Sequence, residues 1–199
     1  MKNLSIYIVV DIETDGPVPS RHAMRNLSAV VMDGAGKELD VFSENLSPIE
    51  GSKPDPDTLI WWEEHNAEVW TKITTDPLPA KDAIKQFETF VRGFQGQRIF
   101  VGHPLAFDGL WVSHYMETFI GQSLMAFHGT QAPLFFGAGI DLPSFVAGVL
   151  DIDYSLCRHG RYPPEVATHL PHTHHGLDDA RGHADVLRKT FQVLEQRRR

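Results

Sequence analysis

A buried strand that ends in two alternating acids constrains this chain more than any other stretch. Residues 6–10 are apolar and mostly β-branched, which is typical of a strand covered on both faces. Asp11 and Glu13 follow, before Gly16 and Pro17 end the strand. Because residues i and i+2 of a strand point to the same face, the two carboxylates project to one side. The same residues also fit a strand that simply runs out into a polar turn.

Two ionised carboxylates side by side at the end of an apolar strand repel each other and lose hydration. A divalent cation compensates both effects, since hard ions such as Mg²⁺ bind carboxylate oxygens. The stretch therefore raises the hypothesis of a metal site built on the first strand, which other parts of the chain must support.

The length and composition suit an ordinary globular protein. With 199 residues, 42% of them hydrophobic, the chain can form one domain over 1–199 with a sizeable core. No apolar run reaches membrane-spanning length, and the first one is too short for a signal peptide, so we expect a cytoplasmic protein without membrane contact. The single cysteine, Cys157, excludes an internal disulfide and a cysteine-based zinc site.

The formal net charge of −8 argues against a large basic groove for long duplex nucleic acid. It leaves a nucleic-acid substrate open, because acids that bind cations become locally positive. Eleven histidines are many for this length. Six of them crowd toward the end of the chain: His159, His169, His172, His174, His175 and His183.

Apolar patterning predicts strands first and then an alternation of strands and helices, which indicates an α/β fold with a mixed central sheet flanked by helices. Residues 27–32 and 38–46 continue the first strand as an antiparallel meander around the turn at 33–36. Further strands are expected at 98–101 and 134–140, the latter burying Leu134, Phe135 and Phe136. Residues 151–173 are expected to be a loop with short helices.

The expected helices follow from apolar spacing and end signals. One begins at the cap Asp57 and carries Trp61, Trp62 and Trp70 as core residues. The others span about 79–94, 107–119 and 142–150, and the last starts near Leu177. The closing arginines at 197–199 suit the negative end of that helix's dipole.

Two further acids stand where sites collect in such folds, at helix N-termini beyond the carboxyl ends of strands. Asp108 lies in the first turn of the helix after strand 98–101, and Asp179 in the first turn of the last helix. Each one alone is also explained by the favourable interaction of an acid with the helix dipole. In combination with the acids of the first strand, they form a much more specific pattern.

Three motifs carry this pattern: Asp11-x-Glu13 on a strand, His103-x-x-x-Phe107-Asp108 at a strand-to-helix junction, and His174-x-x-x-x-Asp179-Ala180 entering a helix. In their order and in the span they cover, nearly the whole chain, the sequence resembles the DEDDh (DnaQ-like) 3′–5′ exonuclease family. The second motif departs from the family, which often has Asn where this chain has Pro104. Proline cannot donate a hydrogen bond, so that contact is either absent or supplied elsewhere.

The resemblance implies a ribonuclease H-like three-layer fold and hydrolysis of phosphodiester bonds at the 3′ end of single-stranded RNA or DNA. It implies two divalent cations, Mg²⁺ or Mn²⁺, bound by Asp11, Glu13, Asp108 and Asp179. Asp11 would contact both ions, and Glu13 and Asp179 the ion that holds the attacking water. His174 would be the general base, with a pKa raised by the neighbouring carboxylates. His175 is its nearest rival.

The expected substrate contacts are fewer. Backbone amides near Thr14 and Asp15 would meet the terminal sugar, and Phe107 would stack on a base or fill the core. Phosphate contacts are assigned to Arg158, Arg161 and Arg181.

Several alternatives stay open. They are an enzyme for very short oligonucleotides, a small-molecule phosphohydrolase, and a catalytically silent nucleic-acid-binding or scaffold module of the same fold. Relatives are often dimers, so a homodimer is one option. His172, His174 and His175 can also bind zinc adventitiously, although a dedicated zinc site is not expected from their spacing.

Overall fold

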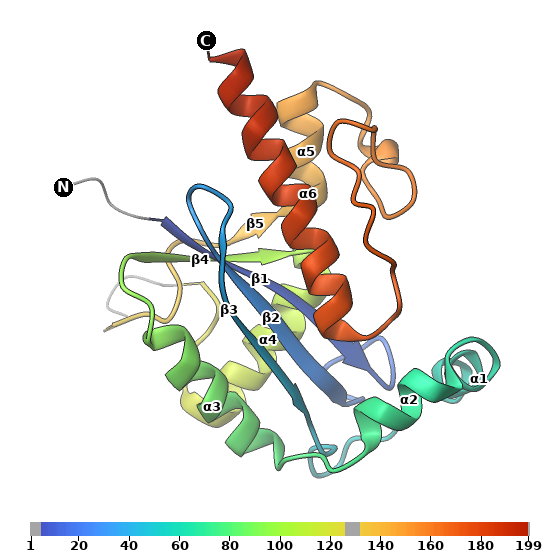
Figure 1. Cartoon of the computed structure of the whole chain (residues 1–199). Helices are drawn as coiled ribbons and strands as arrows, with labels where there is room; N and C mark the ends of the chain where they lie inside the picture. The colour runs from blue at the N-terminus through green and yellow to red at the C-terminus, as the bar shows by residue number, and fades with distance from the viewer. Residues whose placement is uncertain (1–4, 126–131, 199) are drawn as a thin grey trace.

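A mixed five-stranded sheet forms the centre of the protein (Figure 1). The computed structural model describes residues 5–125 and 132–198. The strands are β1 (Ser5–Thr14), β2 (Met24–Asp33), β3 (Glu38–Asn45), β4 (Gln97–Gly102) and β5 (Ile140–Asp141), in the spatial order β3-β2-β1-β4-β5. β1 pairs with β2 and β2 with β3 antiparallel, whereas β4 pairs with β1 and β5 with β4 parallel. The predicted meander with added parallel strands is confirmed.

Helices cover both faces of this sheet and give a three-layer arrangement (Figure 1). They are α1 (Pro56–His65), α2 (Ala67–Thr74), α3 (Ala80–Arg92), α4 (Leu105–Ile120), α5 (Leu142–Leu150) and α6 (Gly176–Arg197), with a short 3₁₀ helix at Tyr154–Leu156. α3 and α4 pack on one face with one hydrophobic cluster, and α5 and α6 on the other face with a second. No helix of the described residues is long and apolar enough to cross a bilayer.

The alternation of side chains along β1 decides which way its acids face. Ile8, Val10 and Ile12 belong to the cluster under α3 and α4, whereas Val9 belongs to the cluster under α5 and α6. Asp11 and Glu13 continue the Val9 side because of the two-residue period of a strand. Both carboxylates therefore face the layer that contains α6.

The region expected to be one helix around the tryptophans is two helices, and that prediction is wrong. α1 ends before Asn66 and α2 begins after it. The cap is Asp55 instead of Asp57: its carboxylate accepts a 2.9 Å hydrogen bond from the Thr58 amide. Pro56 explains this register, since proline suits the first helical position and leaves the preceding residue as the cap.

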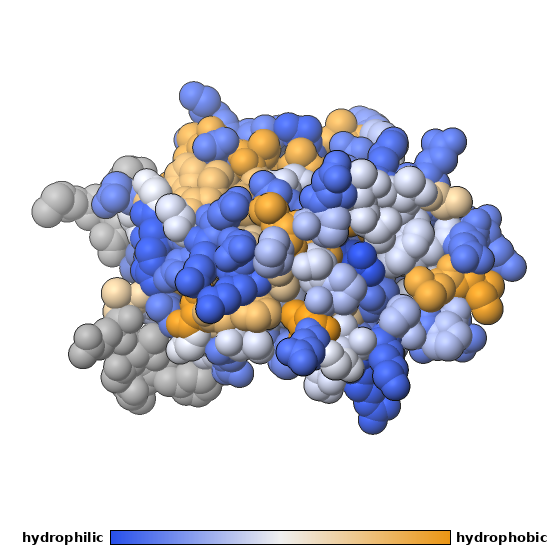
Figure 2. All heavy atoms as spheres, turned by 90° about the horizontal axis from the view of Figure 1, so that it is seen from below, coloured by the Kyte–Doolittle hydropathy of each residue, from blue (hydrophilic) through white to orange (hydrophobic). Residues whose placement is uncertain are grey.

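The three tryptophans were expected in the core, and only one of them is fully buried. Trp62 is 2% exposed, whereas Trp61 is 37% exposed on α1 and Trp70 is half-buried. Ile60 next to Trp61 is 51% exposed. A face of the molecule turned 90° from Figure 1 shows hydrophobic side chains in several separate groups among hydrophilic ones (Figure 2).

The predicted strand over 134–140 is wrong except at its last residue. Leu134 and Phe135 are buried, as expected, but Phe136 is 58% exposed and no strand forms there. Gly137 and Gly139 take positive φ angles of 71° and 88°, which interrupts the extended backbone. β5 consequently begins only at Ile140.

Candidate active site

Three carboxylates from two elements meet beside the carboxyl end of β1. Asp11 and Glu13 on β1 and Asp179 on α6 each place an oxygen so that all three atoms lie within 4.8 Å of one another. Their residues are only 9%, 9% and 3% exposed. Segments at opposite ends of the chain therefore bring like charges into one small, nearly buried volume.

Gly176 allows α6 to place Asp179 there. A Cβ atom at Gly176 would lie 2.5 Å from Asn26 Oδ1 and 3.0 Å from Ser28 Oγ on β2. Since Ser28 pairs with Asp11 in the sheet, the first turn of α6 rests directly beside the acid of β1. Only a residue without a side chain permits this approach.

Backbone amides fix the carboxylate of Asp179. The Thr173 amide donates to Oδ1 at 2.9 Å, and the His174 amide donates to Oδ2 at 3.0 Å. His172 Nδ1 also lies 2.9 Å from Oδ2. The segment before α6 thus fixes the position of the acid and brings two histidines close to it.

Asp108 reaches the same region from the β4–α4 junction. It is 2% exposed, and its carboxylate accepts a 2.6 Å hydrogen bond from the His103 amide. The amide of Leu105, next to Pro104, donates to the side chain of Asp141 at 2.9 Å. Burial raises the pKa of Asp108 to about 7, although the hydrogen bond from His103 opposes the shift.

The electrostatics of the cluster are unbalanced. Burial, and then repulsion by the neighbouring acids, raises the pKa values of Asp11 and Glu13 well above the ordinary range. Within the described residues, no lysine or arginine forms an ion pair with these four acids. His183 Nδ1 lies 3.6 Å from Asp11 Oδ1, but burial lowers the pKa of His183 well below its usual range. Among the described residues, no lysine or arginine balances the charge of the cluster, and an all-oxygen donor set of this kind fits Mg²⁺ or Mn²⁺.

His174 lies beside this cluster in a left-handed backbone conformation with φ of 57°. Its ring is half-buried and meets Trp61 edge-on, with 5.0 Å between centroids. Burial and the neighbouring His172 lower the pKa of His174, and Asp179 only partly offsets this. The expectation that carboxylates raise its pKa is therefore wrong in direction, because loss of hydration outweighs their attraction in the metal-free protein.

Three other histidines take part in this region, and only His103 among them belongs to one of the sequence motifs. His172 contacts Asp179, His183 faces Asp11, and His103 stacks on His183 at 4.1 Å. His103 Nε2 is also 2.8 Å from the Tyr162 hydroxyl. For His172 and His183, the crowding of histidines after residue 158 was the only signal in the sequence, and it carried no spacing that identified partners.

The side chains of Thr14 and Asp15 shape the turn after β1. The Thr14 hydroxyl donates to the Gly16 carbonyl at 2.9 Å. Asp15 is 1% exposed and accepts from the Ala23 amide at 2.6 Å, and it forms an ion pair with Arg25. The Asp15 amide donates to the Ala23 carbonyl at 2.9 Å, so it is already engaged and is not free for a sugar hydroxyl.

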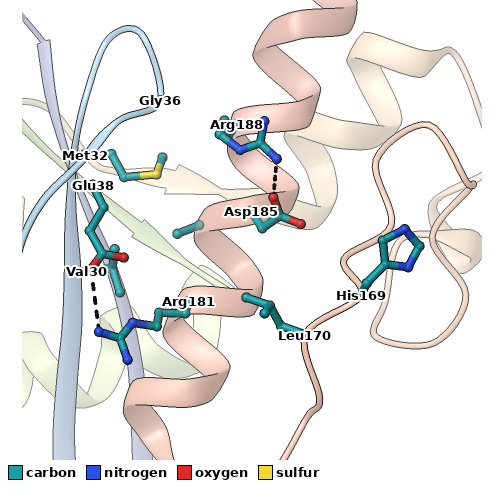
Figure 3. A pocket seen from close by; sticks show the side chains of 10 residues that line it. Val30, Met32, Gly36, Glu38, His169, Leu170, Arg181, Asp185 and Arg188 are labelled. Carbon is teal, nitrogen blue, oxygen red and sulfur yellow. Dashed lines mark hydrogen bonds and ion pairs between the residues drawn. The ribbon is translucent and has the colours of Figure 1, made fainter.

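Among the described residues, neither Phe107 nor the candidate arginines form a side-chain hydrogen bond or ion pair with the four acids. Phe107 is partly buried and packs against the core cluster under α4. Arg181 points toward β3 and pairs with Glu38 at 3.6 Å, at the edge of a pocket of about 300 Å³ (Figure 3). Arg158 and Arg161 are exposed on the loop before α6. Arg197 donates to the last carbonyls of α5, and Arg199 lies outside the described residues.

Comparison with known protein families identifies the family of this chain. The sequence matches the family described as the 3′-5′ exoribonuclease Rv2179c-like domain over residues 6–191. The chain belongs to this family. A similar curated protein is the 3′-5′ DNA exonuclease Cap18 of Escherichia coli, which is 25% identical over 196 residues, covering 97% of this chain and 95% of Cap18.

Solved structures that share the fold of this Rv2179c-like protein include nucleases. The nuclease domain of 3′hExo, a DEDDh family member bound to rAMP, superposes with a TM-score of 0.69 at 12% identity, covering 96% of this chain and 92% of that domain. Exonuclease I from Methylocaldum szegediense gives a TM-score of 0.67 at 16% identity, covering 95% of this chain and 40% of that chain. The ribonuclease H-like fold and the DEDDh 3′–5′ exonuclease class predicted from the motifs are confirmed.

Proposed function

We propose that this Rv2179c-like protein removes nucleotides from the 3′ ends of single-stranded RNA or DNA with the help of two divalent cations. The observation that carries the proposal is the convergence of Asp11, Glu13 and Asp179 within 4.8 Å, with no neutralising cationic side chain among the described residues. Bound Mg²⁺ or Mn²⁺ would supply an activated water and stabilise the charge on the leaving oxygen. We also propose that residues 1–199 act as one domain.

The protein groups in this proposal have separate tasks. Asp11, Glu13 and Asp179 would hold the ions directly, and Asp108 would support them from the β4–α4 junction. The backbone amides of Thr173 and His174 keep Asp179 oriented toward β1. These groups are set by the fold before any ion binds, which lowers the cost of assembling the site.

His174 is the proposed general base. Its low pKa keeps the imidazole neutral near neutral pH, which is the form that can accept a proton from the attacking water. Its ligand atom lies within 4.8 Å of an Asp179 oxygen, close to the ions this acid would hold. His175 is the nearest alternative, and its buried Nδ1 has no hydrogen-bond partner among the described residues.

Trp61 is the proposed platform for the terminal base. It is 37% exposed, and its ring meets His174 edge-on and stacks on His65 at 5.6 Å. An aromatic face beside the reacting phosphate provides stacking that tolerates every base, worth roughly 1–3 kcal/mol per base. Trp61→Ala is therefore expected to raise KM for oligonucleotides by about tenfold or more while changing kcat much less.

The choice between RNA and DNA is also part of the proposal. The family is described as an exoribonuclease domain, whereas Cap18 is named as a DNA exonuclease. We therefore propose single-stranded RNA and single-stranded DNA as the two candidate substrates. The 2′-hydroxyl is the group that would decide, and it acts close to the terminal sugar.

The test is digestion of 5′-labelled single-stranded RNA and DNA with Mn²⁺ or with EDTA. The proposal predicts a ladder that shortens from the 3′ end with Mn²⁺ and no products with EDTA. Asp11→Asn should lower the rate on the order of 10³-fold. Digestion with EDTA, hydrolysis of nucleoside phosphates but not of oligonucleotides, or full activity of Asp11→Asn would refute it.

A second arm of the same experiment tests the base. His174→Ala is expected to lower kcat by about 10²–10⁴-fold. His175→Ala serves as the matched control and should retain most of the activity. If His175→Ala lost the activity and His174→Ala kept it, the assignment of the base would be wrong.

A further inference from the structure

A second set of potential metal ligands overlaps the acidic cluster at one residue. His172, His174 and Asp179 each offer one ligand atom, and these atoms lie within 4.8 Å of one another. Two imidazole nitrogens and one carboxylate oxygen are a donor set typical of zinc. Mg²⁺, in contrast, favours oxygen ligands alone.

The distances in this set are close to those of a zinc site. With zinc–ligand bonds of about 2.0–2.1 Å and tetrahedral angles, neighbouring ligand atoms lie about 3.3 Å apart. His172 Nδ1 and Asp179 Oδ2 are 2.9 Å apart, and no pair in the set exceeds 4.8 Å. The widest separation must therefore close by at most about 1.5 Å, the difference between 4.8 and 3.3 Å, which a small rotation of an imidazole ring provides.

The surroundings already hold these rings near one another. The rings of His172 and His174 have centroids 4.3 Å apart, and His172 stacks on His159 at the same distance. Trp61 also meets His174 edge-on, with 5.0 Å between the ring centroids. All three ligands come from the segment 172–179, so zinc would not have to bring distant parts of the chain together.

We propose that His172, His174 and Asp179 bind Zn²⁺, and that zinc bound there inhibits the nuclease. The site would use Asp179, which the catalytic ions need, and His174, the proposed base. The binding claim stands on the donor atoms alone, whereas the inhibition rests on the proposed function. Of the three proposed zinc ligands, only His172 is neither one of the four acids nor the proposed base.

Binding is tested with the full chain by equilibrium dialysis against Zn²⁺ in a large excess of Mg²⁺. The proposal predicts one tightly bound zinc per chain in the wild type and at least about tenfold weaker binding in His172→Ala and His172→Gln, since even the groups that support zinc ligands contribute this much. Co²⁺ in place of zinc gives a second readout, a visible absorption band of a nitrogen-ligated tetrahedral ion that His172→Ala should lose.

Two controls separate this claim from the proposed function. His169→Ala removes an exposed histidine outside the set and should bind zinc like the wild type. Glu13→Gln removes an acid that the zinc set does not use, so it should lose digestion but keep its zinc affinity. An active Glu13→Gln would count against the proposed function and leave the zinc result standing.

Inhibition is measured as the ratio of digestion rates with and without zinc within each variant, so changes in basal rate cancel. At a zinc concentration that slows the wild type by about tenfold, His172→Ala should be slowed by less than about twofold, because its affinity is weaker by at least that factor. The proposal is overturned if the wild type binds no zinc in excess Mg²⁺, or if both His172 variants bind zinc and are inhibited like the wild type.

Discussion

Replacing Glu13 by glutamine is expected to stabilise the metal-free protein while removing its activity. The Glu13 side chain is almost the same size as glutamine, is 9% exposed, and lies with Asp11 and Asp179 in a cluster whose oxygens are within 4.8 Å. Two unit charges at 4.8 Å repel by about 3.5 kcal/mol at an effective dielectric constant of about 20. Taken at this widest separation, two fully ionised neighbours set a ceiling of roughly 7 kcal/mol on the repulsion that the substitution relieves.

The observed gain will be smaller than this ceiling, because the acids escape repulsion by binding protons. Burial, followed by repulsion from Asp179 and Asp108, raises the pKa of Glu13. A carboxyl group whose pKa is higher in the folded state favours folding only while it is protonated, so metal-free stability falls as the pH rises from the ordinary carboxyl pKa through the folded-state pKa. For Asp108, with a pKa of about 7, this fall extends to neutral pH.

The assay is thermal unfolding in EDTA at a pH above neutrality. If about 2–3 kcal/mol of the ceiling remains, Glu13→Gln should melt roughly 5–10 °C above the wild type, since each kcal/mol shifts Tm by about 2–4 °C in a chain of this size. Glu117→Gln on the exposed face of α4 is the matched control and should leave Tm nearly unchanged. Saturating Mg²⁺ should then raise Tm more in the wild type than in Glu13→Gln.

The reasoning would be refuted by a Glu13→Gln variant that melts below the wild type in EDTA. That outcome would mean that Glu13 makes favourable contacts that outweigh its repulsion. Equal stabilisation of both proteins by Mg²⁺ would refute the link between the uncompensated charge and ion binding.

Two further substitutions test the packing around the site and the pH response of the core. Gly176→Ala should destabilise the protein by about 1–3 kcal/mol and lower activity, because its Cβ would meet Asn26 at 2.5 Å. The control Gly148→Ala in α5, with open space around it, should stabilise the protein by up to about 1 kcal/mol. Equal melting temperatures of the two variants would contradict this prediction. Burial raises the pKa of Tyr115 to about 12, so the folded protein keeps a proton that the unfolded chain releases near pH 10, and wild-type stability should fall by roughly 3 kcal/mol between these values. Tyr115→Phe leaves the Met24 amide without its 2.7 Å acceptor, so this variant should be less stable than the wild type at neutral pH. Above pH 10 its free energy of unfolding in urea should decline less steeply than that of the wild type. A parallel decline of both proteins would show that Tyr115 is not the titrating group.

Sequence patterns predicted the sheet because the deciding signals in it are local. The alternation along β1 assigns Asp11 and Glu13 to the face opposite Val10, and a strand-to-helix junction places Asp108 at a helix start. The structure brings these acids and Asp179 together, and their roles in catalysis stay predictions. Local patterns also predicted α5 and α6.

The misses depend on contacts that local patterns do not encode. At Asn66 the backbone leaves the helical region, with φ of −147° and ψ of 39°, and this separates α1 from α2. The coil around Phe135 is set by the glycine conformations that follow it. The approach of His172 to Asp179 depends on the path of the loop over 151–173, which is held in part by Lys189 donating to the Ala167 carbonyl at 2.6 Å. The low pKa of His174 likewise reflects burial, which the motif alone does not reveal.

We propose above all that four acids, from the start, the middle and the end of the chain, bind a pair of cations. Anomalous diffraction from crystals soaked in Mn²⁺ tests it most directly. Two manganese peaks about 4 Å apart are expected, contacted by Asp11, Glu13, Asp108 and Asp179. A saturated crystal with no manganese at these carboxylates, or with manganese only at His172 and His174, would contradict it.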